Sequence, residues 1–188
     1  LKNINTELFD IHCFSLKVVS MKESFKKCNW HVVKGTSPEA LKEIIIKEKI
    51  DILFDLASQT GDNRLDTFVL KPAPIQISYI GYPNTSGLSN MDYHIVDNYT
   101  DSDGITPGPN GVIRPSTQKY YSEKLLFMPN CFLNYLPSTG VEPENLPVLN
   151  DVQPCIENGY LTIGTFNRYN KINDSVVAVW EKILERCP

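Results

Sequence analysis

KPAPIQISYIGYPNTSGLSNMDYHIVD, residues 71–97, is the stretch on which the fold of this chain depends. Ile75, Ile77 and Tyr79 alternate with polar residues, which predicts a short strand with one apolar face. A loop rich in glycine, proline and asparagine follows, and residues 92–97 resume an extended apolar run. In open α/β sheets, ligands bind at loops that leave the carboxyl ends of strands, although an ordinary strand connection has a similar composition. The loop is therefore a candidate ligand site.

Strands and helices alternate before this stretch. Residues 8–16 and 30–33 are predicted to be strands, and the Ser-Pro pair at 37–38 is expected to begin a helix. Residues 51–56 are predicted to form a buried strand and residues 63–70 a helix. This alternation predicts right-handed crossovers and a parallel sheet, so the expected fold class is α/β and Rossmann-like. The sequence has no GxGxxG pattern, which argues against a dinucleotide-dependent oxidoreductase.

The chain changes character after this stretch. Proline, glycine and aspartate crowd into residues 98–118, which predicts a surface loop, and residues 137–154 resemble a linker. Residues 160–164 are then expected to form a strand, and residues 174–187 an amphipathic helix capped by its first or second residue.

These features predict a fragment in three parts. Residues 1–97 are expected to be the end of a first Rossmann-like lobe, and residues 98–158 a loop and linker region. Residues 159–188 are expected to contain the first strand and helix of a second lobe, because a strand, a loop and a helix open a Rossmann-type half.

The composition limits the function classes. Hydrophobic residues make up 41% and charged residues 21% of the 188, which is typical of a globular protein. The net charge of −4 argues against nucleic acid as the main partner. The five cysteines include no CxxC pair, which favours reduced thiols in the cytoplasm or nucleus and argues against a zinc site. We find no signal peptide and no apolar run of transmembrane length, so no membrane partner is expected.

Several motifs, in order, resemble the catalytic region of the O-GlcNAc transferase / SPINDLY family. They are Arg64-Leu65, Pro72-Ala-Pro-Ile-Gln76, Gly81-Tyr-Pro-Asn-Thr-Ser-Gly87, Met91-Asp-Tyr93 and Asp97, followed by YSEKL at 121–125 and MPNCFLNYLPS at 128–138. The resemblance implies a two-lobed GT-B fold and inverting, metal-independent transfer of a sugar from UDP-GlcNAc to Ser or Thr of intracellular proteins. It implies no cofactor, since the nucleotide sugar is a co-substrate. Relatives also carry tetratricopeptide repeats, which are not visible here, and this chain alone is expected to be inactive.

The resemblance also implies site residues. Phe166-Asn-Arg-Tyr-Asn-Lys171 is similar to the family's FN(Q/N)xxK motif, so Lys171 is the expected catalytic residue, stabilising the diphosphate that leaves. The expected donor-binding residues are Thr60, Ile80, Gly81, Tyr82, Pro83, Asn167, Arg168 and Asn170, and no metal ligand is expected.

Three residues depart from the family pattern. Arg168 stands where relatives have Gln or Asn, Asn170 replaces a tyrosine of the animal enzymes, and Gln59 replaces a frequent histidine. Gln59 cannot titrate near neutral pH, so an acid–base role is not available at that position. Among the histidines, only His94 is a candidate for the site, while His12 and His31 are expected to be packed or surface residues.

Two alternatives to UDP-GlcNAc transfer stay open. Asn84 and the CFLNYLPS stretch are closer to SPINDLY members, which implies GDP-fucose as donor and protein O-fucosylation. The departures at Gln59 and Arg168 would instead fit a catalytically inactive α/β module that binds proteins.

Overall fold

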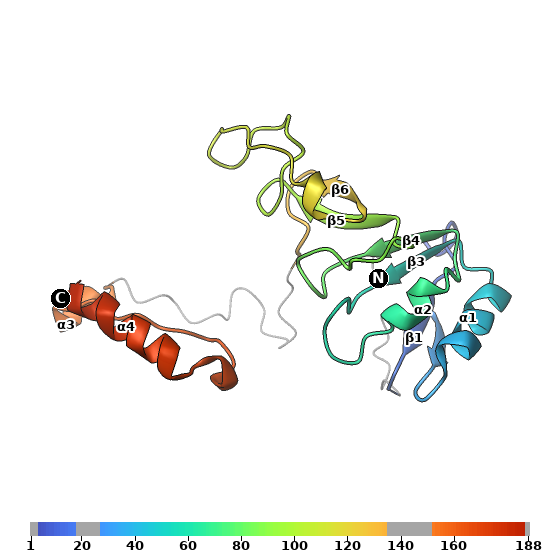
Figure 1. Ribbon diagram of the computed structural model, residues 1–188, viewed down its shortest axis with the longest axis horizontal. Helices are drawn as coiled ribbons and strands as arrows, with labels where there is room; N and C mark the ends of the chain where they lie inside the picture. Colours follow the sequence, from blue (N-terminus) through green and yellow to red (C-terminus); the bar gives the residue numbers. More distant parts are fainter. Residues whose placement is uncertain (1–3, 18–26, 135–151, 187–188) are drawn as a thin grey trace. The chain divides into compact units, whose positions relative to one another are not determined.

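The computed structural model describes residues 4–17, 27–134 and 152–186. The chain divides into two compact units, Leu1–Tyr135 and Leu136–Pro188, which we call unit 1 and unit 2. All the strands in the described part of the chain belong to unit 1 (Figure 1).

Unit 1 is built on parallel strands. One sheet has the order β3 (Ile52–Asp55), β4 (Ile75–Ser78), β5 (Tyr93–Asp97) and β6 (Lys124–Met128), and the other pairs β1 (His12–Ser15) with β2 (Asn29–Val32). Every pairing in both sheets is parallel. The carboxyl ends of β3 to β6 therefore meet at one edge (Figure 1), and the predicted α/β fold class is confirmed.

Helix α1 (Pro38–Lys47) begins where the sequence predicts. The hydroxyl oxygen of Ser37 accepts a hydrogen bond from the backbone N–H of Ala40 (3.2 Å), and Pro38 occupies the first turn, where its missing N–H is not needed. Leu41 and Ile45 on its inner face are buried. The predicted N-cap is confirmed.

One hydrophobic cluster holds unit 1 together. Helix α2 (Leu65–Val69) contacts α1, and both lie on the same side of β3 and β4 in Figure 1. The buried members come from both helices, from β3 and from the segments that follow or precede strands: Val33, Leu41, Ile45, Leu53, Phe68, Ala73 and Met91.

The segment predicted as loop and linker, 98–158, contains a strand. Residues 124–128 form β6, which pairs with β5 from Tyr93 to Asp97. Its apolar run, residues 125–128, is too short to predict a strand by itself, and pairing with the edge of β5 makes the segment a strand. The loop before β6 is irregular, as predicted, but it is anchored: Ser102 is buried and its hydroxyl donates to the backbone oxygen of Arg114 (2.8 Å).

Unit 2 differs from the sequence prediction in two places. The expected strand at 160–164 is irregular and exposed, because a strand needs a neighbour and the described part of unit 2 supplies none. Helix α3 (Pro154–Asn158) lies in the expected linker and ends at Gly159, whose φ of 72° is the left-handed conformation that glycine adopts without strain.

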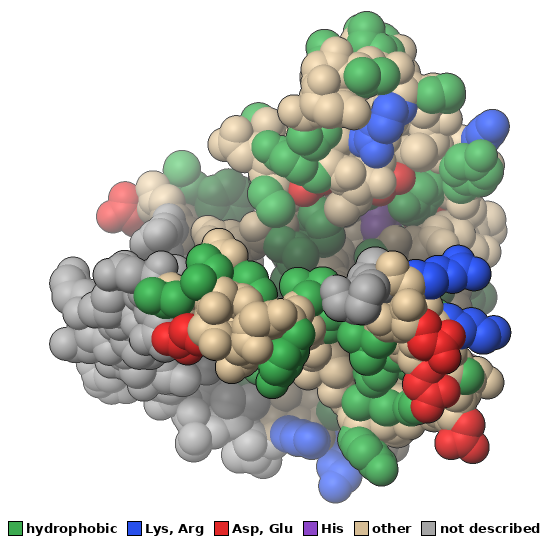
Figure 2. All heavy atoms as spheres, turned by 90° about the vertical axis from the view of Figure 1, so that its left-hand side faces the viewer, with side chains coloured by type: hydrophobic (Ala, Val, Ile, Leu, Met, Phe, Trp, Pro, Cys, Tyr) green, Lys and Arg blue, Asp and Glu red, His purple; other side chains and the backbone are tan. Residues whose placement is uncertain are grey.

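Helix α4 (Asp174–Arg186) confirms the predicted amphipathic helix, but its cap is different. Asn173, one residue before the expected caps, accepts a hydrogen bond through Oδ1 from the N–H of Val176 (3.1 Å). The apolar stripe of α4 is exposed, at Val177, Val179, Trp180, Ile183 and Leu184. Figure 2 shows further hydrophobic side chains at the surface, in groups among polar side chains and backbone. None of the described helices combines the length and apolar composition needed to span a bilayer.

Candidate functional site

Four loops meet at the carboxyl edge of β3 to β6, where α/β folds bind ligands. They hold a small cavity of about 20 Å³, which is room for about one water molecule. Its lining comes from three of the loops and from β5: Ile80, Tyr82, Pro83, His94, Ile95, Val96, Thr100, Asp101 and Phe132. Small-molecule sites typically enclose roughly 300–1,000 Å³, so this cavity alone is too small to enclose such a ligand.

The backbone at the end of β4 is strained. Ile80 has φ of +63°, and the N–H of Gly81 donates to the backbone oxygen of Tyr79 (2.8 Å), which closes a three-residue turn. Ser58, in the loop after β3, has φ of +46°. A β-branched residue in this region is uncommon, and such strain, on the order of 1–3 kcal/mol, clusters at functional sites.

Gly81 is required by a close approach between two loops. A Cβ atom there would lie 2.5 Å from the backbone oxygen of Ala57 and 2.6 Å from that of Leu56. The neighbour that approaches Gly81 is the backbone that follows β3. Gly81 therefore fixes the distance between the loops that follow β3 and β4.

A buried carboxylate, Glu123, holds the β4–β5 loop. It is 1% exposed and lies just before β6. Its Oε1 accepts hydrogen bonds from the backbone N–H (2.7 Å) and the hydroxyl of Ser86, and its Oε2 accepts from the Thr85 hydroxyl (2.7 Å). Burial alone would raise the pKa of Glu123, but the hydrogen bonds from Ser86 and Thr85 outweigh it and hold the pKa below its usual range.

Nothing in the sequence around Glu123 marks it as a site residue. It lies in the YSEKL motif, 37 residues from Ser86, so no local pattern links the two. One signal was available, because the resemblance includes both motifs. GYPNTSG contains Ser86, and YSEKL contains Glu123. An acidic residue at the entrance to an apolar run is a candidate for a buried, hydrogen-bonded carboxylate.

A second carboxylate, Asp97, joins the end of β5 to the segment after β6. It accepts hydrogen bonds from the backbone N–H groups of Tyr99 (2.8 Å), Thr100 (2.9 Å) and Phe132 (2.8 Å). Burial acts to raise the pKa of Asp97, but these N–H groups, led by that of Phe132, lower it overall. The two loops that carry Thr100 and Phe132 into the cavity are thereby fixed to one side chain.

Unpartnered polar atoms lie beside the cavity. His94 is 3% exposed, and its Nδ1 has no hydrogen-bond partner among the described residues. Ser78, its neighbour across the β4–β5 pairing, and Ser58 are buried with hydroxyls that likewise lack one. Burial lowers the pKa of His94. This effect outweighs that of the carboxylates of Glu123, Asp101 and Asp55, which act to raise the pKa. His94 is therefore neutral near pH 7, and its Nδ1 lies at the predicted site as an available polar group.

The predicted site residues of unit 1 lie at this edge. Ile80, Tyr82 and Pro83 line the cavity, and Gly81 lies between them. Thr60 is exposed in the neighbouring loop, where its hydroxyl donates to the backbone oxygen of Ala57 (2.6 Å) and can still accept a hydrogen bond.

Gln59 has a structural role in place of a titratable one. Its Nε2 donates to the backbone oxygen of Ser86 (3.1 Å), which ties the loop after β3 to the β4–β5 loop. A glutamine at this position therefore connects the two loops without supplying a general base.

The predicted site residues of unit 2 lie together in one exposed turn. The 3₁₀ helix η4 (Tyr169–Lys171) contains Asn170 and Lys171, and Asn167 and Arg168 precede it. The N–H of Lys171 donates to the backbone oxygen of Arg168 (2.9 Å), which closes the turn. All four side chains are exposed, so the lysine is accessible to a ligand.

Comparisons with known proteins agree with this geometry. The profile of Glycosyl transferase family 41 matches residues 5–135. The chain is 37% identical over 159 residues to "Probable UDP-N-acetylglucosamine--peptide N-acetylglucosaminyltransferase SPINDLY" of Arabidopsis thaliana and 38% identical to its counterpart in Hordeum vulgare. Each alignment covers 85% of this chain and 15% of the relative, so the chain spans less than a sixth of these proteins. The relative named SEC from Arabidopsis thaliana is 28% identical over 193 residues.

A solved structure shares the fold. A mutant of the Thermobaculum terrenum O-GlcNAc transferase superposes with a TM-score of 0.65 at 26% identity, covering 94% of this chain and 31% of that one. The predicted GT-B fragment is thereby confirmed.

We expect Gly81→Ala to destabilise unit 1. The added methyl group would meet the Ala57 and Leu56 backbone, and overpacking of this kind typically costs about 1–3 kcal/mol. The midpoint of urea unfolding measures the loss. Gly61→Ala is the control, since a Cβ atom there meets nothing within 4 Å. Equal midpoints for the two variants would contradict the close approach.

We also expect stability to fall in acid through Glu123. Its folded pKa is depressed, so the folded state binds fewer protons than the unfolded state. The stabilisation that Glu123 provides is therefore fully present above the ordinary carboxyl pKa of about 4.3. It is lost as the pH falls through the lower pKa that Glu123 has in the folded state.

Urea unfolding of Glu123→Gln between neutral pH and about pH 3 tests this expectation. At neutral pH the free energy of unfolding of the variant is expected to be lower by about 1.5–3 kcal/mol, because charge-assisted hydrogen bonds are lost. The stability of the variant should also depend less on pH. Glu43→Gln, on the exposed face of α1, should change stability by less than about 0.5 kcal/mol. A Glu123→Gln protein with the wild-type acid profile would be inconsistent with a depressed pKa.

Proposed function

This chain belongs to Glycosyl transferase family 41, and on that premise we propose that its parent protein transfers a sugar from UDP-GlcNAc to Ser and Thr hydroxyls of other proteins. The observation that carries the proposal is the carboxyl edge of unit 1, where buried carboxylates fix a strained loop at the place where α/β folds bind ligands. The names of the SPINDLY and SEC relatives support UDP-GlcNAc as the donor.

Unit 1 contributes a rigid wall for the donor. Ile80, Tyr82 and Pro83 present backbone and ring surface to the cavity, and the Thr60 hydroxyl is available to accept a hydrogen bond from a sugar. The hydrogen bonds of Glu123 and Gln59 hold this wall before a ligand arrives. Preorganisation of this kind reduces the entropy lost on binding and orients the anomeric carbon for attack.

Unit 2 contributes the charge for the leaving group. When the acceptor hydroxyl attacks the anomeric carbon, its proton passes to water, the bond to the diphosphate breaks, and negative charge develops on the diphosphate oxygen. The exposed ammonium of Lys171 stabilises that charge, and Asn167, Arg168 and Asn170 hold the donor beside it. A single displacement inverts the anomeric configuration. The proposed reaction uses no metal or cofactor, because the lysine supplies the positive charge.

GDP-fucose is a second donor candidate. The chain is 37–38% identical to the SPINDLY relatives named above and 28% identical to SEC, and Asn84 and the CFLNYLPS stretch also resemble SPINDLY members. A SPINDLY-type protein O-fucosyltransferase would use the same unit 1 wall and the same lysine. The nucleotide base and the sugar would differ.

The proposed partners are nucleotide sugars and protein acceptors, in the cytoplasm or nucleus. Cys13, Cys28, Cys131 and Cys155 are free thiols in the described part of the chain, which supports a reducing compartment. A catalytically inactive binding module is the remaining candidate. The observation in its favour is Gln59, which makes structural hydrogen bonds where a titratable residue is expected.

Transfer assays on the full-length parent test the proposal. The protein is incubated with a Ser/Thr-rich acceptor and with UDP-GlcNAc or GDP-fucose in separate reactions. We expect transfer from UDP-GlcNAc, and Lys171→Ala is expected to reduce kcat by about 10²–10³-fold because one charge-stabilising group is lost. Lys182→Ala is the control, since Lys182 lies exposed on α4 away from the turn.

Each outcome has a distinct meaning. Transfer from GDP-fucose alone would show that GDP-fucose is the donor, and the proposed mechanism would stand. Transfer that survives Lys171→Ala would remove the catalytic role of the lysine. No transfer from either donor, with normal binding to protein partners, would establish the inactive module.

A further inference from the structure

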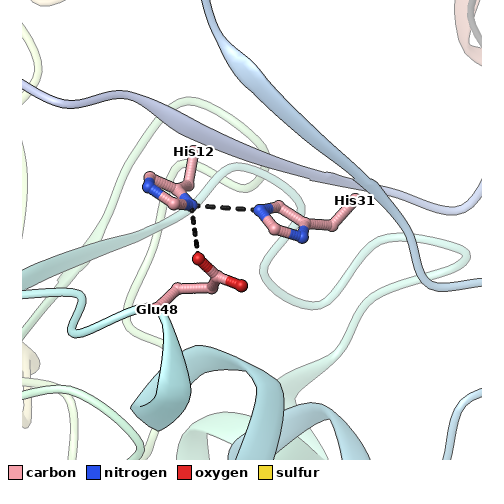
Figure 3. Close-up of side chains that lie close together, drawn as sticks. All are labelled: His12, His31 and Glu48. Atoms are coloured by element: carbon pink, nitrogen blue, oxygen red, sulfur yellow. Dashed lines mark hydrogen bonds and ion pairs between the residues drawn. The ribbon is translucent and has the colours of Figure 1, made fainter.

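Two histidines and a glutamate meet outside the candidate functional site. His12 opens β1, His31 lies in β2, and Glu48 follows α1 (Figure 3). The Nδ1 of His12 lies 3.0 Å from the Nε2 of His31 and 3.8 Å from the Oε2 of Glu48. One ligand atom from each residue lies within 4.8 Å of the others, and all three residues are partly buried.

The fold brings these residues together through strand pairing. Asn29 pairs with His12, and His31, two residues further along β2, pairs with Phe14. Because side chains alternate along a strand, His12, Phe14 and His31 share one face, and Cys13 projects from the other. The His31 ring stacks on both neighbours, with centroids 4.8 Å from Phe14 and 5.2 Å from His12. Packing therefore restricts both imidazoles.

Asp10 orients His12 toward the cluster. The Nε2 of His12 lies 3.1 Å from Oδ2 of Asp10, while Oδ1 of Asp10 accepts a hydrogen bond from the Nδ2 of Asn29 (2.7 Å). A proton on Nε2, donated to Asp10, leaves the lone pair of Nδ1 directed at His31 and Glu48. Metal-binding histidines are typically oriented in this way, by a carboxylate that accepts from the second ring nitrogen.

The two distances from His12 are close to those of a zinc site. Zn–N bonds of about 2.0–2.1 Å place two tetrahedral ligand atoms about 3.3 Å apart. The two imidazole nitrogens, now 3.0 Å apart, need to separate by about 0.3 Å. The Glu48 oxygen, 3.8 Å from His12, needs to approach by about half an ångström, which a long side chain at a helix end can do by rotation.

We propose that His12, His31 and Glu48 bind one divalent cation of the zinc type, through Nδ1, Nε2 and a carboxylate oxygen, with water completing the coordination. Imidazole and carboxylate together suit such ions. The three ligands belong to β1, β2 and the end of α1, so the ion would cross-link these elements. Glu48 precedes β3 and lies at the amino edge of the sheet, away from the transfer site at the carboxyl edge. The role is therefore structural.

The sequence predicts no metal site, because the three residues are widely spaced along the chain. His12 and His31 lie 19 residues apart in different strands, and Glu48 belongs to a third element. No local motif joins them, and only the parallel pairing of β1 and β2 reveals the cluster.

Metal titration of the complete 188-residue chain tests the site. After treatment with a chelator, the chain is titrated with Zn²⁺ alone and with Co²⁺ alone, and folding is checked by circular dichroism. We expect one ion per chain, a higher midpoint of thermal unfolding with Zn²⁺, and visible Co²⁺ absorption without the intense near-ultraviolet band that thiolate ligands add. Imidazole ¹⁵N shifts should report binding by Nδ1 of His12 and Nε2 of His31.

Variants separate the site from adventitious binding. His12→Asn and His31→Asn should abolish the stoichiometric binding, and Asp10→Asn, which retains all three ligands, should weaken it by about 10–100-fold. Glu48→Gln should weaken it, and the matched control Glu43→Gln, within the preceding helix α1, should not. Absence of one-to-one binding, or binding that survives both histidine variants, would overturn the proposal. If the histidine variants fail to fold, the Asp10→Asn affinity and the ¹⁵N shifts decide.

Discussion

Buried carboxylates that accept backbone N–H groups are the interaction on which the carboxyl edge of this sheet depends. Glu123 binds Ser86, Asp97 binds Phe132 and two residues of its own loop, and Asp55 binds the N–H of Ser58 (3.0 Å). A buried charge is costly unless hydrogen bonds compensate it, and charge-assisted bonds are the strongest available. These carboxylates therefore fix the loops at the carboxyl edge of the sheet.

This arrangement explains how a strained loop is maintained. Ile80 has positive φ and Gly81 lies against the Ala57 backbone, so the turn after β4 is held from two sides. Glu123 then fixes the far end of the same loop, at Ser86. The GYPNTSG and YSEKL motifs thus act together: the first supplies the loop, and the second supplies the carboxylate that holds it. A wall fixed in this way suits a reaction in which the donor must be oriented before an acceptor hydroxyl attacks.

The sequence predicted features that local patterns determine, and it missed those that depend on distant partners. Ser37 capped its helix as expected, and β4 and β5 formed where apolar residues recur, because both effects act within a few residues. Strand β6 and the role of Glu123 were missed because each needs a partner about 30 or more residues away. The strand expected at 160–164 had the right composition but no neighbour in the described part of unit 2. For the site, resemblance supplied Ile80, Tyr82 and Pro83, and only the structure supplied the residues that hold them.

Amide hydrogen exchange of individual residues tests the central claim most directly. If Glu123 fixes the β4–β5 loop, the Ser86 amide is protected in the wild-type chain, although it belongs to no helix or strand. In Glu123→Gln, Ser86 should lose that protection, while the Phe132 amide, bound to Asp97, should keep its own. A Ser86 amide that exchanges at the rate of an open loop in the wild-type chain would contradict the account.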